Sequence, residues 1–214
     1  MAVSICPCAN EHNDKARKVL EDGTYDNIIP AFLLAIKRWT VITFVSVYSI
    51  LVYHLTQSLL QTGILIVALY NLLFAVLWYV MHRLIKGPLL ADMDDVQVNY
   101  QSSDKTNFWV AVTDSDIVIG TVAITVKEKQ ESVAYLRRMA VSREYRRLGI
   151  AKRLLKVALE FCESNGYNQV ELITTEVQAP AQRLYESFGF QVVDRWPRKY
   201  KGFVLWTYTL LLHL

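Results

Sequence analysis

The residues most suited to chemistry lie in a short basic segment around one glycine. The segment is Arg146-Arg147-Leu148-Gly149-Ile150-Ala151-Lys152, and it follows an alternating run, residues 134–141, that predicts a strand. Gly149 opens a predicted helix, whose first amides lack an intrahelical acceptor and carry the positive end of the helix dipole. Small residues there let a ligand approach the backbone, so the segment predicts a diphosphate-binding turn. An ordinary strand-to-helix turn with a solvated basic face is the alternative.

The elements around this turn alternate between strands and helices. Gly166 stands where a left-handed C-cap would end the helix that Gly149 opens. Residues 169–175 predict another strand, Pro180 suits the first turn of a short helix, and Gly189 ends that helix before Phe190 begins a further strand. The order is therefore strand, phosphate turn, helix, strand, helix, strand. One face of the first helix carries the apolar residues Ile150, Leu154, Ala158 and Phe161.

Two motifs on these elements resemble those of the GCN5-related N-acetyltransferase superfamily. The superfamily's coenzyme-A turn, Gln/Arg-x-x-Gly-x-Gly/Ala, is matched by Arg146, Gly149 and Ala151. Its second signature is similar to Ala181-x-x-Leu184-Tyr185-x-x-x-Gly189-Phe190. Upstream, residues 108–113 and 118–127 predict two strands around a turn at residues 114–116. The resemblance implies an α/β (α+β) fold, in which a mixed, mostly antiparallel sheet is flanked by helices.

The resemblance also implies acetyl-CoA as co-substrate and suggests its contacts. Backbone amides of Met139, Ala140 and Val141 would hold the pantetheine arm and polarise the thioester carbonyl. Tyr185 would protonate the coenzyme-A sulfur, because a phenol is a donor at neutral pH; a packing tyrosine is the alternative. Gln178 stands where the family often places an asparagine that contacts coenzyme A. The diphosphate would be held by Arg146, Arg147, Leu148, Gly149, Ile150, Ala151 and Lys152.

The same strands supply the residues that we predict to act as general base and to contact the acceptor. Tyr135 occupies the position at which histone-type relatives carry a catalytic glutamate. Glu171 is therefore the predicted base, with Glu176 and a water relay as alternatives. Tyr135 and Arg137 are predicted to contact the acceptor, where Arg137 could clamp a carboxylate bidentately; an arginine bridging neighbouring strands is the alternative. Strand alternation predicts one shared face for Tyr135, Arg137, Met139 and Val141.

An apolar insert spans residues 39–86. Within it, residues 41–55 and 63–81 are almost wholly apolar, and a membrane-spanning helix needs about 20 such residues. Lysine, arginine and histidine flank the insert, whereas the connection at residues 56–61 has no lysine or arginine. This distribution predicts a helical hairpin that enters a membrane from the cytosol, either crossing fully or re-entrant. Two helices of a large soluble core are the alternative.

The insert divides the chain into three predicted parts. Residues 1–38 form the first strand and helices of the acetyltransferase fold, residues 39–86 the membrane hairpin, and residues 87–214 the catalytic core. If the first strand joins the sheet of the core, both flanks of the insert must lie on one side of the membrane.

An acetyltransferase with an insert at this position resembles the camello-like N-acetyltransferase family. The Arg-Arg-Met-Ala-Val strand and the Gly-Ile-Ala-Lys turn support the same resemblance. It implies an enzyme of the endoplasmic reticulum membrane, with its catalytic domain in the cytosol, that acetylates a cysteine S-conjugate or another amino acid such as aspartate. A protein-lysine N-acetyltransferase of the secretory pathway and an inactive acetyl-CoA-binding membrane protein are the alternatives.

Composition sets further bounds on partners. A net charge of +3 over 214 residues is too small to indicate nucleic-acid binding, so the predicted partners are acetyl-CoA, a small amine and the lipid bilayer. The three cysteines form no disulfide framework. Cys6-x-Cys8 has no Cys/His pair at ligand spacing elsewhere, so no metal site is predicted.

Overall fold

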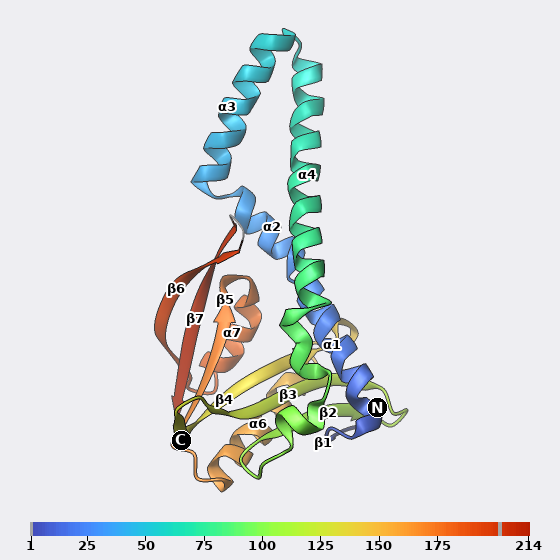
Figure 1. Cartoon of the computed structure of the whole chain (residues 1–214), viewed down its shortest axis with the longest axis vertical. Coiled ribbons are helices and arrows are strands. Elements are labelled where there is room, and N and C mark those ends of the chain that lie inside the picture. The colour runs from blue at the N-terminus through green and yellow to red at the C-terminus, as the bar shows by residue number, and fades with distance from the viewer. Residues whose placement is uncertain (1, 201–202) are drawn as a thin grey trace.

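The chain folds around one seven-stranded sheet, and a long helical hairpin projects from it (Figure 1). The computed structural model describes residues 2–200 and 203–214. The strands lie in the order β1-β2-β3-β4-β5-β7-β6. Their bounds are β1 (Val3–Pro7), β2 (Asn107–Thr113), β3 (Val118–Lys127), β4 (Gln130–Val141), β5 (Gln169–Thr175), β6 (Gln191–Tyr200) and β7 (Phe203–His213). The helices are α1 (Asn13–Tyr25), α2 (Ile28–Ile36), α3 (Trp39–Thr56), α4 (Leu59–Ile85), α5 (Val96–Tyr100), α6 (Ile150–Ser164) and α7 (Ala179–Glu186).

The sheet is antiparallel at every neighbouring pair except β4 and β5, which run parallel. β1 pairs with β2, so the N-terminal strand completes a sheet whose other strands all follow the hairpin in sequence. The hairpin is therefore an insertion within one folded unit.

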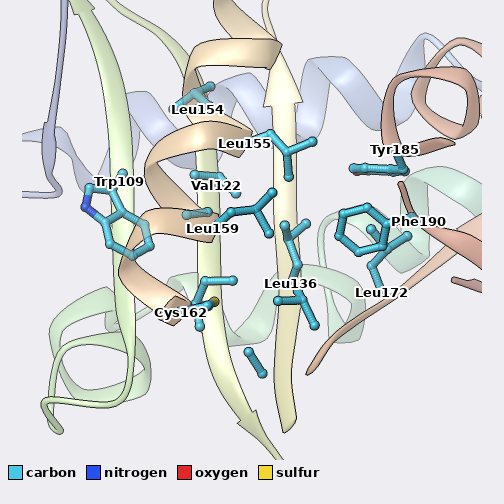
Figure 2. Close-up of a cluster of buried hydrophobic side chains, with 14 of the residues drawn as sticks. Trp109, Val122, Leu136, Leu154, Leu155, Leu159, Cys162, Leu172, Tyr185 and Phe190 are labelled. Carbon is cyan, nitrogen blue, oxygen red and sulfur yellow. The ribbon is translucent and has the colours of Figure 1, made fainter. Parts of the chain in front are cut away.

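Two buried clusters cover the two faces of the sheet, as alternating side chains of β2 show. Trp109 points to the cluster built around α6, and its neighbours Phe108 and Val110 point to the cluster built around α1 and α5. Because both faces are covered, β2 and the first part of β3 are almost continuously buried. Figure 2 shows the α6 cluster, with Trp109 at one end and Tyr185 beside Phe190 at the other.

The hairpin helices α3 and α4 are long, apolar and hardly buried inside the chain. They contain 18 and 27 residues, so they are about 27 and 40 Å long, compared with about 30 Å for the hydrocarbon core of a bilayer. By length and composition, each is able to cross a membrane. The turn between them uses Gln57 at φ 52° and Ser58, whose hydroxyl accepts a hydrogen bond from the Gln61 amide at 3.4 Å.

Polar contacts hold the base of the hairpin to the folded unit. Lys86 Nζ lies 2.6 Å from a Glu21 carboxylate oxygen, and the Tyr25 hydroxyl lies 2.7 Å from His82 Nδ1. On the other side, Arg38 Nη2 donates to Glu176 Oε1 at 2.5 Å. These contacts join α4 to α1 and join the start of α3 to the segment that follows β5.

The fold class predicted from the sequence is confirmed. The strands at residues 118–127 and 169–175 have their predicted bounds, and Gly149 and Gly166 flank α6 at φ 76° and 74°. The segment between the hairpin and β2 forms the 3-10 helix η2 (Pro88–Met93) and α5, and neither was predicted from the sequence.

Candidate functional site

The central feature of the site is a divergence between β4 and β5. The two strands pair only from Val133 with Gln169 to Leu136 with Leu172. Beyond that point β4 follows β3, and β5 follows β7. Within the described residues, no strand pairs with the facing edge of β4 from Met139 to Val141. An exposed strand edge can hold an extended ligand by backbone hydrogen bonds.

The turn after β4 leads from this edge to the N-terminus of α6. Arg147 has a φ of 66° and Gly149 a φ of 76°, both in the left-handed region. A Cβ on Gly149 would meet nothing within 4 Å, so the turn faces open space. Gly149 caps α6 without a side-chain hydrogen bond, which leaves the first helical amides available to an anion. This geometry fits the diphosphate of coenzyme A, and the β4 edge fits its extended arm.

The basic side chains of the turn divide into two pairs. Arg146 Nη2 lies 2.6 Å from Asp26 Oδ2 and its Nε donates to the Val141 carbonyl at 3.0 Å, while Arg153 donates to the Val3 carbonyl at 2.6 Å. These two arginines brace the turn against α1 and β1. Arg147 and Lys152 are exposed, and no ion pair within the described residues holds them. A direct diphosphate contact by the Arg146 side chain remains a prediction.

Tyr185 lies on α7 at the open end of the divergence. Its side chain is 6% exposed and its ring packs against Phe190, with ring centroids 5.8 Å apart. Burial raises the pKa of Tyr185 above its usual value of 10, so the phenol is protonated at neutral pH. A buried phenol at the edge of the opening can donate a proton.

Gln178 and Glu176 follow β5, and of these two residues Gln178 lines the cavity described below. The Gln178 side-chain oxygen accepts hydrogen bonds from the hydroxyls of Thr174 and Thr175, both at 3.2 Å. Glu176 accepts from Arg38 and, at 2.9 Å, from the Trp206 amide. Glu176 therefore ties the base of the hairpin to the sheet.

Glu171, the predicted base, lies in an ion pair. Its Oε2 is 2.6 Å from Lys127 Nζ, and the carboxylate side chain is 14% exposed. Tyr135 is its neighbour across the β4–β5 ladder, and burial raises the pKa of that phenol. Both residues are within the described chain, and neither lines the cavity described below. Their roles in catalysis and acceptor binding remain predictions.

The predicted alternation along β4 is wrong beyond Arg137. Arg138 has a φ of 54° and forms a bulge opposite β3, where the register moves from Ala123 with Arg137 to Thr121 with Ala140. As a result, Met139 and Val141 pack with the α6 cluster, whereas Arg137 points with Arg138 towards η2. Arg137, before the bulge, therefore lies on one face of the sheet, and Met139 and Val141, after it, lie on the other face.

A partly buried clamp that was not predicted from the sequence holds this bulge. Asp92 on η2 accepts from Arg138 Nε at 2.9 Å and from Nη2 at 2.5 Å, a two-point contact. The Leu89 carbonyl accepts a third bond from Arg138 at 2.9 Å, and the Tyr100 hydroxyl donates to Asp92. Burial, with Asp92 as a second cause, raises the pKa of Tyr100 to about 12. The Arg137-Arg138 pair was the only signal in the sequence.

A cavity of about 620 Å³ begins at the divergence and continues between α2 and α4. At the catalytic end it is lined by four of the predicted residues, Arg137, Met139, Gln178 and Tyr185, and by Arg138 and Arg198, which the sequence analysis did not single out. The divergence thus leads to two spaces. One is the open backbone edge of β4 with the turn before α6, and the other is the cavity, which has arginines at its mouth. This arrangement can polarise a carbonyl, donate a proton and hold a carboxylate.

Comparisons with known proteins give a consistent result. The model of the acetyltransferase (GNAT) family matches residues 77–190. The Xenopus tropicalis protein named "Probable N-acetyltransferase camello" is 32% identical over 197 residues, which cover 88% of this chain and 86% of that protein. N-acetylaspartate synthetase from the same organism is 33% identical over 83% of this chain, which spans 65% of that protein's length.

A solved structure shows the same fold. An acetyltransferase of the GNAT family from Staphylococcus aureus Mu50 aligns with a TM-score of 0.55 and 16% identity, covering 96% of this chain and 98% of that one. The likeness thus includes nearly all of both chains.

Proposed function

Because this chain belongs to the acetyltransferase (GNAT) family and is an acetyl-CoA-dependent N-acetyltransferase, we propose that its acceptor is the amine of a cysteine S-conjugate or another amino acid. The observation that carries this proposal is the position of Arg137. Its guanidinium lines the cavity beside the divergence, 3.8 Å from Asp92 and 5.7 Å from the centre of the Tyr135 ring. A guanidinium there suits an acceptor with a carboxylate near its amine.

The chemistry requires one bond between heavy atoms to form, one to break, and one proton to be lost by the amine and one gained by the sulfur. The acceptor nitrogen bonds to the carbonyl carbon, the carbon–sulfur bond breaks, the amine loses a proton and the sulfur gains one. Acetyl-CoA supplies the activated thioester. The amides of Met139, Ala140 and Val141 polarise the carbonyl, and the amides from Arg147 to Lys152 hold the diphosphate.

Tyr185 gives the proton to the departing sulfur in this proposal. Its buried phenol lies on the cavity wall next to β5, and its raised pKa keeps the proton in place at neutral pH. Glu171 is proposed as the general base. Because its carboxylate is held by Lys127 outside the cavity, a proton from the amine would reach it through water.

The relatives support an amino-acid acceptor. N-acetylaspartate synthetase, to which this chain is similar, is named for an acetylated amino acid. The test is a panel assay of the purified full chain with acetyl-CoA and S-benzyl-cysteine, aspartate or a lysine peptide. We expect the free amino acids to react faster than the peptide. Faster acetylation of the peptide would contradict the proposal, and no turnover on any acceptor would support the inactive alternative.

We also propose that α3 and α4 anchor the enzyme in the endoplasmic reticulum membrane, with the sheet in the cytosol. Large apolar side chains cover the outside of both helices, including Trp39 at 82% exposure and Leu59 at 79%. Lys37, Arg83 and Lys86 lie at the base of the hairpin, which suits a cytosolic side.

Protease protection of microsomes tests this arrangement. Tags at both termini should be digested, whereas a tag inserted between Gln57 and Ser58 should be protected if the hairpin crosses fully. Digestion of all three tags would indicate a re-entrant hairpin. Protection of one terminal tag alone would contradict the proposed topology.

A further inference from the structure

The cavity extends well beyond the groups that react. Its volume of about 620 Å³ is within the range of about 300–1,000 Å³ that is typical of pockets for drug-sized ligands. Arg137, Gln178 and Tyr185 lie at one end, and the hairpin and the helix that leads to it form two walls of the rest. An amine and a carboxylate would use only the first part.

One wall of the far part is an apolar stripe on α2. Figure 1 shows α2 beside α4, above β5 and α7, and contacts join it to both α4 and the turn after β5. The stripe consists of Ile28, Ala31, Phe32, Ala35 and Ile36. The spacing of three and four residues places these side chains on one helical face. Two of them are alanines, so the wall has room between its larger side chains.

The facing wall is an apolar stripe on α4, in the half nearer the sheet. It consists of Leu73, Val76, Leu77, Val80, Met81 and Leu84. Phe32 packs edge-on against Phe74, with ring centroids 5.2 Å apart, and thereby fixes α2 to α4. The 2.5 Å contact between Arg38 and Glu176 fixes the end of α2 to the catalytic sheet. Both walls therefore have a defined position relative to Tyr185.

Charge distinguishes the two ends. Arg137, Arg138 and Arg198 lie at the catalytic end, and neither stripe contains a charged residue. A ligand that suits both ends has an anionic head and an extended apolar tail.

We propose that the hairpin half of the cavity binds a long apolar tail of the acceptor, so that the preferred acceptor is a lipid-like amino acid. Its amine and carboxylate lie at Tyr185 and Arg137, and its tail lies between α2 and α4. This inference rests on the proposed function. Because α4 forms the wall, a tail dissolved in the bilayer around the hairpin reaches the site without passing through water. Ala35 is a residue that sets the length of tail accepted.

The test is a series of S-alkyl-cysteines, from methyl to dodecyl, assayed with acetyl-CoA and the full chain in lipid nanodiscs. The ratio of kcat/KM for the octyl acceptor to that for the methyl acceptor should be on the order of 100, which three to four buried methylene groups would supply. Ala35→Trp, which fills the space between the stripes, should bring this ratio close to one. The methyl acceptor also reports whether the variant is folded.

Ala75→Trp is the matched control, because Ala75 is exposed on α4 and is not part of the cavity wall. It should keep the ratio of the unmutated enzyme. An unchanged ratio in Ala35→Trp would overturn the inference, because partition into the bilayer alone would then explain the preference for long tails. Faster use of decanoyl-CoA than of acetyl-CoA would also overturn it, by assigning the cavity to the donor. If no acceptor of the series, from methyl to dodecyl, reacts with the unmutated enzyme, the proposed function itself fails.

Discussion

The proposed donor half and the proposed acceptor half of this site are built from different kinds of atoms. The donor half is backbone: the open edge of β4 and the turn into α6, all within residues 139–152. The acceptor half is made of side chains, including some from α2, α4, β4, β6 and α7, which are far apart in the chain. A backbone site depends on a local conformation, whereas a side-chain site depends on how distant elements pack.

This difference explains which half a short motif can reveal. The turn needs positive φ at Gly149, so glycine stands there for a physical reason that any sequence reader can recognise. The acceptor half has no such requirement, because many apolar residues can line a wall between two helices. Single substitutions in the donor half should therefore abolish acetyl-CoA binding, whereas single substitutions in the acceptor half should change which acceptor is preferred.

Gly149→Glu should have the largest effect, the loss of acetyl-CoA binding. A carboxylate near a phosphate about 4 Å away costs about 4 kcal/mol, or about 10³-fold, for each charge. Calorimetry measures the affinity. Gly166→Glu is the matched control, since Gly166 at the other end of α6 has φ 74° and open space around its Cβ position. Equal loss of binding in both variants would attribute the effect to backbone strain.

Tyr185→Phe should lower turnover by about 10²–10⁴-fold with little change in acetyl-CoA affinity, because only the proton donor is removed. Since burial raises the pKa of Tyr185, its ionisation should limit activity only above pH 10. Steady-state kinetics against pH measure both effects. Tyr167→Phe is the control, because that phenol is buried and donates to the Lys105 carbonyl at 2.6 Å. Full activity in Tyr185→Phe would make Tyr185 a packing residue.

Asp92→Asn should lower kcat/KM by about 10- to 100-fold, because the bulge at Arg138 places both the β4 amides and Arg137, and small displacements of reacting groups are costly. Stability should fall by about 2 kcal/mol, since a partly buried guanidinium loses its charged partner. Denaturant unfolding and kinetics test the two effects. Asp94→Asn, in the same segment but paired with Arg17 at the surface, should change neither. An unchanged kcat/KM in Asp92→Asn would mean that the contact between Asp92 and Arg138 does not contribute to catalysis.

Arg137→Ala should have the smallest effect, an increase of about 10-fold in the Michaelis constant for the acceptor, as expected for one lost charge-assisted contact. The constant for acetyl-CoA should stay the same, because this contact belongs to the acceptor half. Two-substrate kinetics measure both. Arg195→Ala, which removes an arginine stacked 4.3 Å from the Trp206 ring, is the control. A change only in the Michaelis constant for acetyl-CoA would place Arg137 in the donor half.

Much of the fold was predictable because its signals are local. The bounds of β3 and β5 were predicted correctly, and glycines marked the ends of α6. The face of Met139 was predicted wrongly, since a bulge at Arg138 shifts the alternation by one residue. The Arg137-Arg138 pair does not by itself predict a bulge. It is held by Asp92, which lies 46 positions earlier in the chain.

The sequence by itself determined the order of the strands and of the two helices α6 and α7, the glycine turn before α6, the apolar hairpin and the family, because each depends on residues close together in the chain. Only the tertiary structure decided that Arg146 braces α1, that Glu171 pairs with Lys127, and that α2 and α4 enclose a cavity leading to Tyr185. These features depend on long-range packing, in which the partner of a side chain is chosen by the geometry of the whole sheet and not by its neighbours in sequence.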